Sequence, residues 1–281
     1  MRRPLTLSFV LALFMSVPVS AQRLWLTDDR MQVVGVEFTK GFIDHDPNFV
    51  PYYDGLSGIA TFFGRVRIDP RMMLTAEIPL SEVQQSGVSF LDPKSHASTD
   101  RFGNPWIGVQ GEFSPLVSLE VGVRPALVSQ QSYVVPEFAS IVDFDHFDAW
   151  TDDNTVVRGL IRAGRVEPRG VFTTGIVGAT AAVKASNLYL DYGIRAGYAW
   201  PAVMASVAGT GRLLVSHNGV NSFDNRLFNQ VEIGATLTRG TWQPKVVVRG
   251  YVDPGIRRTV KAIVTFGLVY GFDAKAATPS P

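Results

Sequence analysis

Apolar and polar side chains alternate with a period of two along most of the chain. In residues 187–198, Leu188, Leu190 and Tyr192 share one face and oppose Asp191 and Arg195. This alternation is typical of β-strands, whose successive side chains point to opposite faces. The pattern predicts twelve strands, at 31–42, 57–68, 71–82, 104–114, 116–128, 155–167, 171–184, 187–198, 202–216, 226–239, 241–253 and 258–272.

The predicted strands are long and their connections alternate in length. Strands of globular proteins typically have about 5–6 residues, whereas a tilted strand needs about 9–11 to cross a bilayer. The connections "DP", "SP", "EPRG", "WPA" and "RG" fall at one rim, and most of those at the other rim are longer. Short periplasmic turns and longer extracellular loops are typical of outer-membrane barrels. We therefore expect an all-β protein, a transmembrane up-and-down antiparallel β-barrel of about twelve strands; a soluble β-sandwich is the alternative.

Charged residues occupy the face opposite the apolar one, and in a membrane barrel that face lines the lumen. Twelve strands enclose an interior wider than apolar side chains alone readily fill. The expected lumen-lining residues are Glu37, Arg65, Glu77, Glu120, Arg124, Arg158, Arg162, Asp191, Arg195, Arg212, Glu232, Lys245, Arg249 and Lys261. With Arg67 and Glu112 on the same parity, cations outnumber anions ten to six, which suggests a slight anion preference. Pairing among these charges would equally stiffen the barrel.

Aromatic side chains occur on the apolar parity at the expected periplasmic ends. They are Phe113, Tyr198, Trp200, Trp242, Tyr270 and Phe272. Tyr and Trp favour the headgroup level of a bilayer, so this placement predicts an aromatic belt and contact with outer-membrane lipid.

The N-terminus predicts export. Arg2 and Arg3 precede an apolar run and a small-residue site at Val19-Ser20-Ala21, the order of a secretory signal peptide. We expect a signal peptide at 1–21, a barrel at 22–272, a polar tail at 273–281, and location in the outer membrane. Cysteine is absent, which excludes thiol catalysis, and the net charge of +1 gives no reason to expect a nucleic-acid partner.

Two segments resemble known outer-membrane proteins. "GLVYGF" is similar to the C-terminal assembly signal of Gram-negative outer-membrane proteins, with Gly267, Tyr270 and Phe272 at the signal positions. Phe266 stands where that signal has a polar residue, and nine residues follow Phe272. "GNPWIGVQGEFSPLVSLEVGVRPAL", residues 103–127, resembles the paired-strand segment of phenol-degradation-type and related transporter-like barrels. These resemblances imply recognition by the barrel-assembly machinery and passage of a small solute.

Two further motifs could carry chemistry. "SHNGVNS" has Gly219 two residues after His217, at the position where outer-membrane lipases have a serine. Ser222 has the opposite parity to His217 and cannot replace that serine. We therefore expect no enzyme. "DFDHFDAWTDD", within Asp143 to Asp153, could bind Ca²⁺ or fold its aromatics Phe144, Phe147 and Trp150 into the mouth as a constriction. We expect no cofactor. If the barrel does not conduct, loops 83–103 and 129–154 would provide a binding surface.

Overall fold

The structure, a computed structural model, describes residues 32–44, 52–53, 57–86, 96–127, 138–139, 142–150, 153–166, 169–216 and 227–272. The predicted signal peptide, the polar tail and the "HNGVNS" motif (217–222) lie outside these residues.

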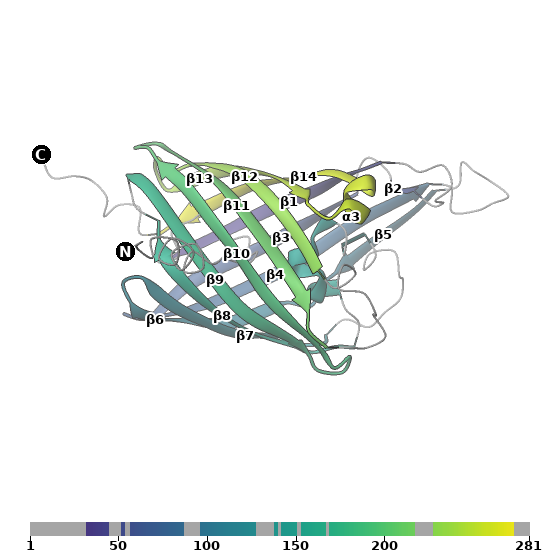
Figure 1. The fold of residues 1–281 in the computed structure, drawn as a ribbon, viewed down its shortest axis with the longest axis horizontal. Coiled ribbons are helices and arrows are strands. Elements are labelled where there is room, and N and C mark those ends of the chain that lie inside the picture. Colours follow the sequence, from purple (N-terminus) through teal and green to yellow (C-terminus); the bar gives the residue numbers. More distant parts are fainter. Residues whose placement is uncertain are drawn as a thin grey trace, which may run out of the picture.

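A closed antiparallel barrel forms the fold (Figure 1). Its strands are β1 (Val33–Ile43), β3 (Gly58–Asp69), β4 (Met72–Ser86), β6 (Trp106–Ser114), β7 (Val117–Arg124), β8 (Val156–Arg165), β9 (Gly170–Ala182), β10 (Asn187–Ala199), β11 (Val203–Leu214), β12 (Leu227–Leu237), β13 (Trp242–Tyr251) and β14 (Val260–Gly271). Each pairs with its neighbour in sequence, and β1 pairs with β14 to close the ring. The twelve predicted strands and the barrel are confirmed. Closure removes the free edges of a sheet.

Two short strands extend the wall beyond the ring. β2 (Tyr52–Tyr53) and β5 (His96–Phe102) both pair with the end of β4. The assignment of residues 96–102 to a loop is wrong, because Phe102 to His96 pair with Leu80 to Ser86. The stretch "HASTDRF" escapes a periodicity search because its only large apolar residue is Phe102.

The faces of the wall are those of a membrane barrel. Val34, Phe62 and Ile233 are exposed on the outside, whereas Glu37, Arg65 and Thr75 are buried on the inside. A soluble protein would place the apolar face inward, so the sandwich alternative is wrong. Each of the twelve strands of the closed ring has hydrogen-bonded neighbours on both sides, the condition for a sheet to cross a bilayer.

Short turns and exposed aromatic side chains mark one rim. Residues 70–71, 115–116, 200–202 and 238–241 join successive strands there. Trp242 stacks edge-on with Tyr270 at 4.9 Å between ring centroids, and Tyr270 with Phe272 at 5.1 Å. Tyr198 and Trp200 lie 4.6 Å apart between ring centroids. These contacts form an aromatic belt at the rim where β14 ends.

The opposite rim carries the long connections and the helical segments. Between β7 and β8 the chain forms a 3₁₀-helix, η2 (Phe144–Trp150), and α3 (Pro254–Thr259) precedes β14. α3 lies at this rim, as do β2 and β5 (Figure 1). None of the described helices is long and apolar enough to span a membrane.

Candidate functional site

Charged side chains fill the interior of the barrel. The expected lumen-lining residues that the structure buries are Glu37, Arg65, Glu77, Glu120, Arg124, Arg158, Arg162, Asp191, Arg195, Arg212, Glu232, Lys245 and Arg249. Because each lies on a strand of the wall and its apolar neighbours face outward, these side chains line the lumen.

Lys261 lies elsewhere, and its assignment to the lumen needs correction. Its side chain is 55% exposed and its Nζ lies 3.0 Å from Oδ2 of Asp44. The pairing of β1 with β14 shifts at this point, because Phe42 faces Ala262 while Ile43 faces Val260. Such a bulge reverses the inside–outside alternation, so Lys261 leaves the parity it would have in an uninterrupted strand.

Ion pairs between strands organise these charges, and the Lys245–Glu37 pair joins β13 to β1 across β14. Arg162 pairs with Glu120, Arg212 with Asp191, and Lys245 with Glu37. Nε of Arg249 lies 3.2 Å from Oε1 of Glu232. Sequence parity places charges on one face, but only the register between strands decides which of them meet.

Gly267 provides the space in which one of these pairs forms. It is the cross-strand neighbour of both Glu37 and Lys245. A Cβ atom on Gly267 would lie 2.6 Å from Cε of Lys245 and 3.1 Å from Cγ of Glu37. The glycine of the expected assembly signal therefore also has a packing role inside the barrel. Its role in assembly stays a prediction.

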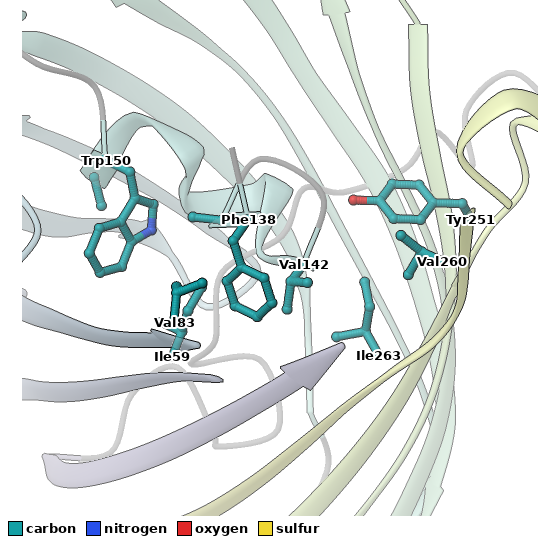
Figure 2. Packing of buried hydrophobic residues seen from close by; sticks show 10 residues of the cluster. Ile59, Val83, Phe138, Val142, Trp150, Tyr251, Val260 and Ile263 are labelled. Carbon is teal, nitrogen blue, oxygen red and sulfur yellow. The ribbon is translucent and has the colours of Figure 1, made fainter. Parts of the chain in front are cut away.

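Part of the long β7–β8 connection lies inside the mouth of the barrel. We call its described residues, 138–139 and 142–150, the inserted segment. Phe138, Val142 and Trp150 are buried against wall residues that include Ile59 and Val83 (Figure 2). The inserted segment therefore narrows the mouth, as expected if the loop folds inward. The side chains of Phe144 and Phe147 lie outside the described part.

An arginine of the wall anchors the polar side of the inserted segment. Nε of Arg124 donates to Oδ2 of Asp148 at 3.0 Å, and Nη2 donates to Oε2 of Glu77 at 2.6 Å. Nη1 donates to the carbonyl oxygen of Asn104 at 3.0 Å. The backbone N–H of Asn104 donates to the carbonyl oxygen of Ala149 at 2.6 Å. The Arg124–Asp148 ion pair and a main-chain hydrogen bond thus join the segment to the wall.

The environment of Asp148 favours its charged form. Burial alone would raise its pKa, but the positive charge of Arg124 and, more weakly, of Arg158, Arg212 and His146 holds the pKa below its usual value of 3.8. The anchor is therefore charged at neutral pH.

Asp143 and His146 form a second polar contact. Nδ1 of His146 lies 3.2 Å from Oδ1 of Asp143, and Nε2 lies 3.7 Å from Oε2 of Glu77. The carboxylates of Asp143 and Asp148 thus have protein partners. Among the described residues no group of acidic and histidine side chains could hold a metal ion.

The inserted segment changes the charge balance of the lumen. Arg67 is exposed and Glu112 is half-buried, so neither belongs to the buried set. Within the described chain, eight cations are buried, namely Arg65, Arg124, Arg158, Arg162, Arg195, Arg212, Lys245 and Arg249. Seven carboxylates are buried with them: Glu37, Glu77, Glu120, Asp191 and Glu232 from the wall, and Asp143 and Asp148 from the inserted segment. The expected cation excess is thus a property of the wall, and the segment nearly cancels it.

Trp106 forms a platform beside the anchor. Its indole lies against the cross-strand pair Gly108 and Gly122, where a Cβ atom on either glycine would collide with it. Its Nε1 lies 3.2 Å from both Oγ1 of Thr75 and Oε1 of Glu120 and donates to them. The guanidinium carbon of Arg158 lies 4.5 Å from the ring centroid.

From the sequence, Asn104 and Trp106 are expected in a strand and in the segment that resembles transporter-like barrels, but not as part of a site. The signal that could have found them is the "GNP" sequence before Trp106, which interrupts strand pairing at residues 103–105.

Comparisons with known proteins bear on the fold. No protein-family model matches the sequence, and no curated protein matches it. The COG4313 outer membrane channel from Pseudomonas putida F1 is similar in structure, with a TM-score of 0.58, 10% identity, and coverage of 90% of this chain and 100% of that chain. LpxR from Salmonella typhimurium has a TM-score of 0.52 and 9% identity, over 85% of this chain and 100% of that chain. At these identities the likeness establishes a barrel fold shared with solved outer-membrane proteins.

Proposed function

We propose that this chain is an outer-membrane channel that passes a small solute through its charged lumen and that the inserted segment closes its mouth. The observation that carries the proposal is the anchor of Asp148 on Arg124. The contacts that hold the segment in the mouth are non-covalent, so the segment can leave the mouth and return. The solved structure described as an outer membrane channel supports the same function by its fold.

The outer face of the wall supports a location in the outer membrane. Exposed aliphatic side chains cover that face and an aromatic belt lies at the turn rim, the arrangement that contact with a bilayer favours. Together with the predicted signal peptide, this supports outer-membrane lipid and the barrel-assembly machinery as partners. Membrane fractionation and heat-dependent migration on a gel test the location, and a soluble periplasmic protein whose migration is unchanged by boiling would contradict it.

Conductance in planar bilayers tests the channel. We expect the full chain to conduct rarely and a variant in which a short Gly-Ser linker replaces residues 128–152 to conduct steadily. Its wall has eight buried cations and five buried carboxylates among the described residues, so its reversal potential should indicate anion selectivity. Replacement of residues 217–226, between β11 and β12, by the same linker is the control, and its conductance should equal that of the full chain. Cation selectivity of the shortened variant would overturn the role assigned to the wall charges.

A sealed structural barrel is the second candidate, and one observation favours it. Ion pairs such as Arg162–Glu120 and Lys245–Glu37 cross between strands and are buried within the lumen. If the shortened variant folds, shown by heat-dependent migration, and still does not conduct, the wall itself is sealed. The loops would then carry the function.

A further inference from the structure

Arg158 differs in its contacts from five of the other buried cations. Arg124, Arg162, Arg212, Lys245 and Arg249 are each held in an ion pair. Arg158 is 1% exposed, and its Nε and Nη2 have no hydrogen-bond partner among the described residues. A buried donor without an acceptor is costly, and more so when it is charged.

The position of Arg158 is fixed by its neighbours on the wall. It faces Gly122 across β7 and Thr180 across β9, and its guanidinium stacks on Trp106. Trp106 is itself held over Gly108 and Gly122. The cation–π contact with the indole ring holds the guanidinium in place without using its N–H groups. The two free donors are therefore preorganised.

A carboxylate is the chemistry that these donors fit. The planar guanidinium presents parallel N–H groups that match a carboxylate in two-point geometry. The neighbouring Arg124, whose guanidinium carbon is 5.8 Å from the same Trp106 ring, already binds such a group in Asp148. The structure thus shows a carboxylate accepted within this cluster.

We propose that Arg158 on Trp106 is a binding site for a small carboxylate-bearing solute, and that this solute competes with Asp148 of the inserted segment. The proposal rests on the channel function for its biological meaning. The positive charge of Arg158 attracts the Asp148 carboxylate. A second carboxylate bound at Arg158 reduces this attraction and repels Asp148. By linkage, the solute weakens insertion of the segment and insertion weakens solute binding by the same factor.

Calorimetric titration of the purified barrel in detergent with sodium benzoate tests the site, with benzyl alcohol as the uncharged comparison and sodium chloride as the simple anion. Of the three compounds, we expect only benzoate to show saturable binding. Arg158→Gln should weaken it at least tenfold, and Arg158→Lys should weaken it also because the planar fork is lost. Arg249→Gln is the matched control, because it removes the same charge from β13, across the barrel. The affinity of this variant for benzoate should stay within threefold of that of the original chain. Asp148→Asn should bind benzoate more tightly.

Several outcomes would overturn the proposal. Absence of saturable binding by both the folded original chain and Asp148→Asn would do so, as would equal binding by Arg158→Gln. Chloride binding with the affinity of benzoate would show a simple anion site instead of a carboxylate site. The expected gain in Asp148→Asn keeps the test decisive if Arg158→Gln fails to fold. Binding is measured without conduction, so its failure is separate from a failure of the channel.

Discussion

Replacement of Asp148 by asparagine should release the inserted segment without unfolding the wall. Asparagine keeps the shape of the side chain and removes its charge. Arg124 then loses one charged partner but keeps Glu77 at 2.6 Å and the carbonyl oxygen of Asn104 at 3.0 Å. The wall cluster therefore stays balanced, with one guanidinium against one carboxylate.

The magnitude follows from that residual pairing. A hydrogen bond to a charged group contributes about 1.5–3 kcal/mol, so insertion should weaken by about 10- to 150-fold. Arg124→Gln is the harsher change, because it leaves Glu77 and Asp148 buried without their cation. Removal of one partner of a buried pair costs about 3–5 kcal/mol, or about 150- to 4,000-fold. Arg124→Gln should therefore weaken insertion of the segment more than Asp148→Asn does.

A single cysteine reports on the release. The chain contains no cysteine, so Val142→Cys provides one thiol in the inserted segment, where Val142 is fully buried. Its rate of maleimide labelling measures the population of segments that have left the mouth. Lys184→Cys, at a site 69% exposed, gives the unprotected rate. Labelling of Val142→Cys should rise by the factors above in the two backgrounds.

The matched control removes a carboxylate of the same connection whose ion pair is exposed. Oδ2 of Asp153 lies 3.3 Å from Nζ of Lys184, and Asp153→Asn should leave labelling unchanged because exposed pairs contribute little. If Asp148→Asn and Arg124→Gln both fold and both label at the original rate, the ion pair does not hold the segment, and the gating argument is wrong.

Two further predictions concern packing and pH. Gly267→Ala should lower the unfolding free energy of the barrel in liposomes by about 1–3 kcal/mol, because the added Cβ would meet Lys245 and Glu37. Gly209→Ala is the control, because a Cβ at that position meets nothing within 4 Å. An equal loss of unfolding free energy in both variants would contradict the packing reason. Burial would raise the pKa of Asp148, but the charge of Arg124 lowers this pKa below 3.8. The charged carboxylate therefore holds the segment in the mouth above pH 3.8, and insertion weakens as the pH falls through the lowered pKa. Open probability measured from pH 5 to 2.5 should rise only at the acidic end, with a smaller rise in Asp148→Asn, and a similar rise in both would exclude Asp148 as the cause.

The barrel was predictable from the sequence because its signal is local and repeated. Each strand shows its period of two, and each turn at one rim is short, so an error in one strand does not alter the pattern. Lys261 shows the limit of this reasoning: one bulge opposite Phe42 and Ile43 reverses the parity, and it depends on how two distant strands pair. β5 was missed because a strand that extends beyond the lipid needs no apolar face.

The candidate site depends on contacts that no local pattern records. The sequence places Arg124 in the lumen, but its anchor joins β7 to Glu77 on β4 and to Asp148 on η2. The Asp-rich loop suggested either a metal or a constriction, and only the fold shows that Arg124 neutralises Asp148 in the mouth. The charge balance of the lumen likewise could not be counted before the segment was known to enter it.

The interior charges follow from how a membrane barrel is stabilised. In a soluble domain, burial of apolar side chains inside supplies the main favourable term, and a buried ion pair often contributes less than an apolar replacement would. Here the wall satisfies its backbone through neighbouring strands and places its apolar surface outside, so the interior need not supply that term. In such a lumen, a buried arginine that no ion pair holds therefore indicates a functional role. Arg162 and Arg212 are accounted for by Glu120 and Asp191, whereas Arg158 has an aromatic platform and two donors without acceptors among the described residues.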